Sequence, residues 1–250
     1  MHVIVSVSFF LLGTIFGSFF NVVGLRLPKD ESFINDRSHC PSCNKQLAAY
    51  ELIPILSFIL QGGKCRHCKA NISYQYPFIE LLTGLLFLYS YLQIGFSPEL
   101  MTALLLVSML IIILVTDLKY MLIPNNILLF FLPLFIVMRI IQPLDPWWLP
   151  IAGGLFGFIM LTLIIILSRG GMGGGDMKLF AVLGVVFGPG HLLVCFFLAC
   201  LLGAIIGLLL LLFKVIKRKQ PIAFGPYIAA AAIITYFHGD SFIQWYINLL

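Results

Sequence analysis

Repeated apolar runs about 20 residues long are the feature that most constrains this fold. The first covers Val3–Leu25, and others lie near 77–95, 99–116, 121–141, 149–168, 178–188, 191–213 and 222–238. A helix of about 20 residues crosses the hydrocarbon core of a bilayer. Only 10% of the residues are charged, against about 25% in soluble domains. We therefore expect an all-α polytopic membrane protein with about eight transmembrane helices.

The apolar runs and one polar segment divide the chain into three parts. We expect a first transmembrane helix over 1–25, a small cytoplasmic loop domain over 26–75 and a transmembrane domain over 76–250. No lysine or arginine precedes the first run, and no small-residue cleavage site follows it. These features favour a retained helix over a cleaved signal peptide.

The distribution of lysine and arginine predicts the orientation. With the N-terminus outside, residues 26–75, 117–120, 169–178 and 214–221 lie inside. Fourteen of the fifteen lysines and arginines then fall on the inner side, and Arg139 is the exception. Cytoplasmic loops carry such an excess. The net charge of +5 is therefore a topology signal, and no nucleic-acid partner is expected, because aromatic–basic interleaving is absent.

Four cysteines in the polar loop form two Cys-x-x-Cys pairs, Cys40 with Cys43 and Cys65 with Cys68, separated by 21 residues. Four soft thiolates at this spacing suit a closed tetrahedral Zn²⁺ site. A closed site has no open coordination position, so we expect zinc to be structural. A redox dithiol pair is the alternative, but no thioredoxin-like βαβ pattern surrounds the cysteines.

Between the cysteine pairs lies a short apolar segment, Glu51–Leu60, followed closely by Gly62-Gly63-Lys64. With about ten residues, this segment is too short to cross a bilayer. We expect it to form an interfacial or re-entrant element.

A glycine-rich stretch with one carboxylate, Asp176, interrupts the apolar runs at 169–178. Each glycine costs about 1 kcal/mol of helix stability relative to alanine. A carboxylate at the centre of a membrane helix costs roughly 2.5–3.5 kcal/mol, and less near the interface. A sequence that retains both unfavourable features is expected to need them for its function. We interpret Asp176 as one half of a catalytic pair, with glycines that let a substrate backbone approach.

The second carboxylate is Asp117, at the end of the run 99–116. The predicted topology puts it at the same inner membrane face as Asp176. Two neighbouring carboxylates cannot both ionise cheaply, so one stays protonated and the pair supplies an acid and a base. Such a pair can activate water and polarise a peptide carbonyl, as in aspartic proteases. The alternative for Asp117 is a solvated interfacial residue paired with Lys119.

These motifs resemble those of the bacterial type IV prepilin peptidases, which are bifunctional leader peptidase and N-methyltransferase enzymes. The Gly-x-Gly-Asp core is shared with presenilin-like and archaeal preflagellin peptidases, but its combination with the cysteine pairs is specific. The resemblance rests on Phe20–Pro28, both cysteine pairs, Glu51–Pro54, Gly63-Lys64-Cys65, 76–80, Asp117 with Ile123-Pro124, Gly173–Lys178 and Phe224-Gly225-Pro226.

The resemblance implies a reaction and a location. The family cleaves type IV prepilins and pseudopilins after a glycine, on the cytoplasmic side of the bacterial inner membrane. It then methylates the new N-terminal residue with S-adenosylmethionine. We therefore expect a multi-pass inner-membrane enzyme that is surrounded by lipid, with catalytic sites facing the cytoplasm.

The resemblance also assigns residues. Asp117 and Asp176 match the catalytic pair. Two further positions, Gly63 and Lys64, match residues that the family ties to methyl transfer. Because Glu51 and Glu80 are negatively charged, we expect them to bind either the amine of the substrate or the sulfonium of the cofactor.

Two other functions stay open on the sequence. One is a peptidase without methyl transfer, in which the zinc loop grips the substrate. The other is a membrane transporter whose two carboxylates carry protons or cations. A transporter would more often show broken helices in two matching halves, whereas the glycine break at 169–178 occurs once.

Overall fold

The computed structural model of the chain describes residues 2–32, 37–168, 172–217 and 222–248. Within these residues the regular structure is helical, with two isolated β-bridges and no strand. The predicted all-α class is confirmed.

The long helices follow the predicted apolar runs. They are α1 (His2–Arg26), α3 (Gln75–Ile94), α4 (Pro98–Tyr120), α5 (Asn125–Ile141), α6 (Leu149–Leu167), α7 (Gly174–Leu212) and α8 (Gly225–Ile247). Among the described residues, the helices α1, α3, α4, α6 and α7 are long and apolar enough to cross a membrane. The chain is therefore a multi-pass membrane protein, and the number of about eight spans stays a prediction.

The predicted runs 178–188 and 191–213 are joined in α7 through a kink. Gly188 has a φ of 71°, and Pro189 follows it inside the helix. A positive φ suits glycine, and proline cannot donate the helical hydrogen bond. The chain turns back sharply at this kink, because the rings of Phe180 and Phe196, one in each half of α7, have their centroids 5.7 Å apart.

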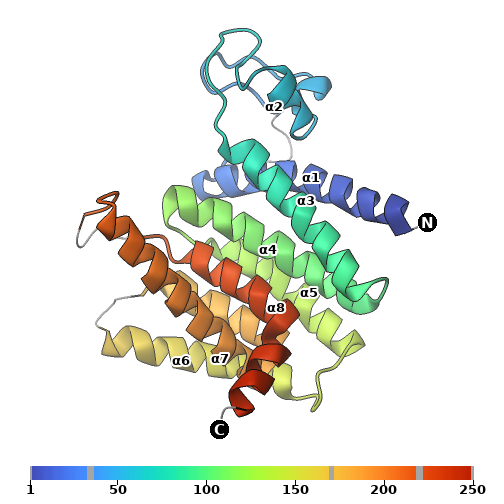
Figure 1. Ribbon diagram of the computed structural model, residues 1–250. Coiled ribbons are helices and arrows are strands. Elements are labelled where there is room, and N and C mark those ends of the chain that lie inside the picture. The colour runs from blue at the N-terminus through green and yellow to red at the C-terminus, as the bar shows by residue number, and fades with distance from the viewer. Residues whose placement is uncertain (1, 33–36, 169–171, 218–221, 249–250) are drawn as a thin grey trace.

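Helix α4 lies at the centre of the bundle, with α1 and α3 on one side and α8, α7 and α6 on the other (Figure 1). It packs against α1, α3, α5 and α8, and its apolar side chains between Leu106 and Val115 are mostly buried. The outer helices expose large apolar side chains such as Leu129, Leu167 and Leu212, as expected of surfaces that face lipid.

The loop that follows α1 lies outside the bundle, beside the ends of α1 and α3 (Figure 1). It contains the short helices η1 (Leu27–Lys29), η2 (Ala49–Leu52) and α2 (Leu56–Leu60). The predicted segment Glu51–Leu60 therefore forms two short helical pieces and does not span.

Arg139, the exception in the predicted topology, is buried in α5 and paired with Glu99 at the start of α4. Its Nη1 lies 3.0 Å from Glu99 Oε2, and its Nε donates to the carbonyl of Val186 in α7 at 3.0 Å. The hydroxyl of Tyr236 in α8 also donates to the Glu99 carboxylate. An unpaired charge inside a bilayer is expensive, so this pairing explains how an arginine is accommodated within an apolar run.

Candidate functional site

The two cysteine pairs lie on turns of the same construction. Asn44 N donates to Cys40 O at 2.8 Å, and Lys69 N donates to Cys65 O at 3.0 Å. Asn44 and Lys69 follow the second cysteine of each pair, and both have positive φ, 55° and 59°. The two turns therefore present their thiols to a common point in the same way.

The four thiols converge as the spacing predicts. The sulfur atoms of Cys40, Cys43, Cys65 and Cys68 all lie within 4.8 Å of one another, and Cys40 Sγ lies 3.8 Å from Cys68 Sγ. Four sulfurs placed tetrahedrally at about 2.3 Å from Zn²⁺ are about 3.8 Å apart. The residues therefore fit a closed metal site.

The electrostatics of this cysteine cluster favour a bound cation. Hydrogen bonds from the backbone amides of Ser42 and Cys43 lower the pKa of the Cys40 thiol to about 6. The backbone amide of Ala70 favours the Cys68 thiolate, but desolvation and the other three thiols raise the pKa of Cys68 to about 11. Neighbouring thiolates repel one another, and a divalent metal ion supplies the positive charge that lets all four ionise.

Asp117 lies in the last turn of α4, with 6% of its surface exposed. Its Oδ2 accepts a hydrogen bond from Gly225 N, at the start of α8, at 2.7 Å. A Cβ at Gly225 would stand only 2.7 Å from the same oxygen, so a glycine is needed for this approach. Among the described residues no ion pair joins Asp117 to Lys119; the carboxylate is bound by the backbone of α8 instead.

Asp176 lies in the first turn of α7, with 8% of its surface exposed. Its Oδ2 accepts a hydrogen bond from Gly173 N at 3.1 Å. A carboxylate in this position satisfies a free amide and interacts favourably with the helix dipole. A Cβ at Gly175 would lie 3.0 Å from the side chain of Ile123, so the start of α7 packs closely on the segment that follows α4.

The structure brings Asp117 and Asp176 together at one end of the bundle. Their carboxyl groups lie close enough for their charges to interact. Lys178 Nζ also donates to Asn125 Oδ1 at 3.0 Å, which ties the start of α7 to the start of α5. Two buried carboxylates in this arrangement can act as acid and base, and their catalytic role stays a prediction.

The four residues predicted to serve methyl transfer lie in the loop and at its junction with α3. Glu51 Oε2 accepts a hydrogen bond from Ala48 N at 2.9 Å. The buried Glu80 of α3 accepts one from Ile55 N at 2.8 Å. Gly63 has a φ of 67°, and the neighbouring Lys64 is exposed. Their assignment to cofactor binding stays a prediction.

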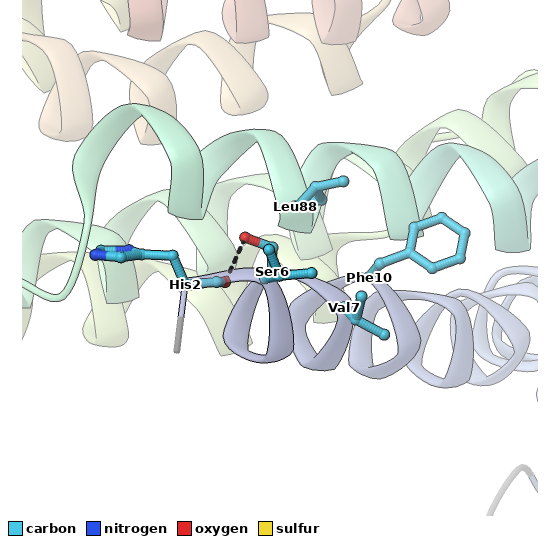
Figure 2. A pocket seen from close by; sticks show the side chains of 6 residues that line it. His2, Ser6, Val7, Phe10 and Leu88 are labelled. Atoms are coloured by element: carbon cyan, nitrogen blue, oxygen red, sulfur yellow. Dashed lines mark hydrogen bonds between the residues drawn. The ribbon is translucent and has the colours of Figure 1, made fainter.

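Two hollows in the helix bundle lie apart from the carboxylates. One, of about 300 Å³, opens between the start of α1 and Leu88 of α3, where the hydroxyl of Ser6 donates to the carbonyl of His2 at 2.9 Å (Figure 2). The other is an apolar groove of about 460 Å³ between α1, α4 and α5. Neither is lined by Asp117 or Asp176, so neither is a candidate active site.

Two contacts in the structure, made by Gly225 and by Asn21, were not predicted from the sequence. Gly225 belongs to a quoted motif, but its contact with Asp117 depends on packing between α4 and α8. Asn21 of α1 is fully buried and donates to the carbonyls of Gly17 and Tyr76 at 3.2 and 3.3 Å. The position of Asn21 within an apolar run could have indicated such contacts, because a buried side-chain amide needs hydrogen-bond partners.

Comparisons with known proteins cover nearly the whole chain. Residues 11–94 match the bacterial peptidase A24 N-terminal domain, and residues 104–208 match the type IV leader peptidase family. A prepilin leader peptidase/N-methyltransferase of Bacillus subtilis is 46% identical over 240 residues, which cover 96% of this chain and 97% of that protein. A protein of the same description from Aeromonas salmonicida is 33% identical, and the match covers 96% of this chain and 93% of that protein. Another, from Pseudomonas aeruginosa, is 32% identical, and the match covers 95% of this chain and 92% of that protein. No solved structure matches the chain.

Proposed function

Because the chain belongs to the type IV leader peptidase family and is a peptidase with N-methyltransferase activity, we propose that it cleaves type IV prepilins or pseudopilins with Asp117 and Asp176. The proposal is supported by two buried carboxylates, one at the end of α4 and one at the start of α7, that lie within range of each other's charge. The matched region 104–208 contains both residues.

In the proposed cleavage, the charged carboxylate takes a proton from a water molecule that attacks the carbonyl carbon of a glycine in the substrate. The protonated carboxylic acid donates a hydrogen bond to the carbonyl oxygen and later protonates the leaving amine. The products are a leader peptide that ends in a carboxylate and a pilin with a new N-terminal amine. Beside Gly174, where a Cβ would meet nothing within 4 Å, the space suits a substrate backbone.

The proposed second reaction methylates that amine. S-adenosylmethionine, when bound, supplies the methyl group. The carboxylates of Glu51 and Glu80 suit the positive charge of a sulfonium or an amine and can accept the proton that the amine loses. The exposed ammonium of Lys64 suits a carboxylate of the cofactor, and Gly63 allows close backbone approach.

We also propose that Zn²⁺ occupies the cysteine cluster and has a structural role. Four thiolates would complete its coordination and join the two turns of a loop that has few other buried side chains. In the bacterial inner membrane, the excess of basic residues at 26–75 would keep this loop and both carboxylates on the cytoplasmic side.

The proposal is tested by co-expressing a prepilin and determining the mass of its N-terminal peptide. We expect Asp117→Asn and Asp176→Asn each to leave the leader attached, while both variants still insert into the membrane. Asp240→Asn, at an exposed aspartate of α8, is the matched control and should cleave normally. Full cleavage by either active-site variant would contradict the acid–base assignment.

A further inference from the structure

Helices η2 and α2 carry a strip of exposed apolar side chains. We call this strip the apolar ridge; it consists of Tyr50, Leu52, Ile53, Leu56, Ile59 and Leu60. Ile59 and Leu60 are 64% and 77% exposed. In the part of the chain that the structure describes, no helix or loop packs over these side chains closely enough to bury them. Contiguous exposed apolar side chains mark an interaction surface.

A hydrogen bond holds the ridge at the level of the membrane helices. Ile55, between η2 and α2, donates its backbone N–H to Glu80 Oε2 at 2.8 Å. Glu80 lies in the second turn of α3 and is buried, and α3 is one of the membrane-spanning candidates. Ile55 also has a φ of 61°, which is unfavourable for a β-branched residue. The corner between η2 and α2 is therefore pinned beside a helix end, where a bilayer has its interface.

Basic side chains accompany the ridge. The guanidinium of Arg66 lies 5.0 Å from the centre of the Tyr50 ring, so a cation is in direct contact with the ridge. Exposed Lys64 and Lys69 are its neighbours in the chain. Residues 26–75 contain seven lysines and arginines and four acidic residues. Apolar and aromatic side chains beside cations are typical of elements that bind anionic lipid surfaces.

We propose that the apolar ridge docks on the anionic lipid surface of the membrane that the bundle spans. The side chains of Ile59 and Leu60 enter the acyl region, and Arg66 binds phosphate groups of the lipids. The cysteine loop is thereby held at its two connections to α1 and α3 and at a third point on the bilayer.

The test measures contact between the ridge and acyl chains directly. Trp147, Trp148 and Trp245 are first replaced by phenylalanine, and a single tryptophan is introduced as Ile59→Trp or, as the control, Ser42→Trp. Each protein is placed in nanodiscs of phosphatidylglycerol with brominated acyl chains. Bromine quenches tryptophan at short range, so fluorescence should fall by roughly half for Ile59→Trp and very little for Ser42→Trp. Equal or absent quenching would overturn the docking, including the case in which a second copy or a substrate covers the ridge.

The role of charge is tested in the same discs. Quenching of the Ile59→Trp protein should be stronger in phosphatidylglycerol than in phosphatidylcholine, and adding Arg66→Glu should remove the difference. Equal quenching in both lipids would overturn the headgroup part of the proposal. Leu60→Trp repeats the measurement one residue further along α2, so that a folding defect of one variant does not decide the result.

Discussion

The contact between Asp117 and Gly225 is the tightest constraint on a candidate catalytic side chain. The amide of Gly225 lies 2.7 Å from Asp117 Oδ2, and an added methyl group would be equally close to this oxygen. Asp117 also lies at the end of a helix whose side chains are mostly buried. The position of the Asp117 carboxylate therefore depends directly on the position of the start of α8.

Gly225→Ala should reduce prepilin cleavage severely without preventing membrane insertion. The new methyl group must push α8 or the Asp117 carboxylate away, and a displacement of about 1 Å in an active site can cost roughly 100-fold in rate. The rate is measured as the cleaved fraction of a co-expressed prepilin over time. Gly190→Ala, where a Cβ meets nothing within 4 Å, is the control. Unchanged cleavage by Gly225→Ala would mean that Asp117 does not need its present position.

Lys64→Ala should separate the two reactions. Lys64 is exposed in the loop, on a different element from α4 and α7. We expect normal cleavage and a lower methylated fraction of the mature pilin, because the proposed ligand of the cofactor carboxylate is lost. One mass spectrum of the pilin N-terminus reports both quantities. Lys29→Ala, at an exposed cation of the same polar segment, is the control, and loss of cleavage in Lys64→Ala would link the loop to the peptidase.

At the scale of elements, the cysteine loop is held together by two equivalent turns rather than by an apolar core. Its buried side chains include Cys40 and Cys65, whereas η2 and α2 contain no fully buried side chain. A closed metal site contributes to folding directly when a small element has no other core. The loop should therefore depend on its metal more strongly than the helices do.

Cys43→Ser should lower the bound zinc to well below one ion per chain and make the loop sensitive to proteases. Three thiolates and a hydroxyl bind Zn²⁺ more weakly than four thiolates. Metal content is measured on the purified protein by atomic emission, and loop cleavage by limited trypsin digestion. Cys200→Ser, at a cysteine of α7 outside the cluster, is the control. An equal zinc content in both variants would rule out the four-thiolate site.

At the scale of the whole molecule, Arg139, Glu99 and Tyr236 join four helices. Glu99 belongs to α4, Arg139 to α5 and Tyr236 to α8, and Arg139 also binds a carbonyl of α7. The same helices carry or contact Asp117 and Asp176 at their other ends. The polar cluster thus fixes how these helices sit relative to one another.

Arg139→Met should lower the thermal unfolding midpoint of the purified protein by roughly 5–10 °C. Removing one partner of a buried pair leaves an uncompensated charge, at a cost of about 3 kcal/mol. Adding Glu99→Gln removes that charge and should restore part of the loss. The midpoints of the wild type, both single variants and the double variant form the measurement. A double variant that loses as much as the two single variants combined would show that the two residues act independently.

Features that depend on residues close together in the chain could be predicted from the amino-acid sequence. Apolar runs predicted the long helices, most of them within a few residues, because hydropathy and length decide which segments enter a bilayer; α8 continues nine residues beyond its predicted run 222–238. The Cys-x-x-Cys spacing predicted the cluster of Cys40, Cys43, Cys65 and Cys68, since each turn is built within five residues. The separate runs 178–188 and 191–213 predicted two helical pieces, and these are the two halves of α7 on either side of Gly188.

Which distant residues come together depends on how the helices pack. Asp117 and Asp176 share a topological face in the sequence, but their proximity results from the packing of α4, α5, α7 and α8. The same packing pairs Arg139 with Glu99 and brings Gly225 onto Asp117. Hydropathy is equal all round a helix that faces lipid on one side and apolar neighbours on the other, so it carries little information on which face packs where.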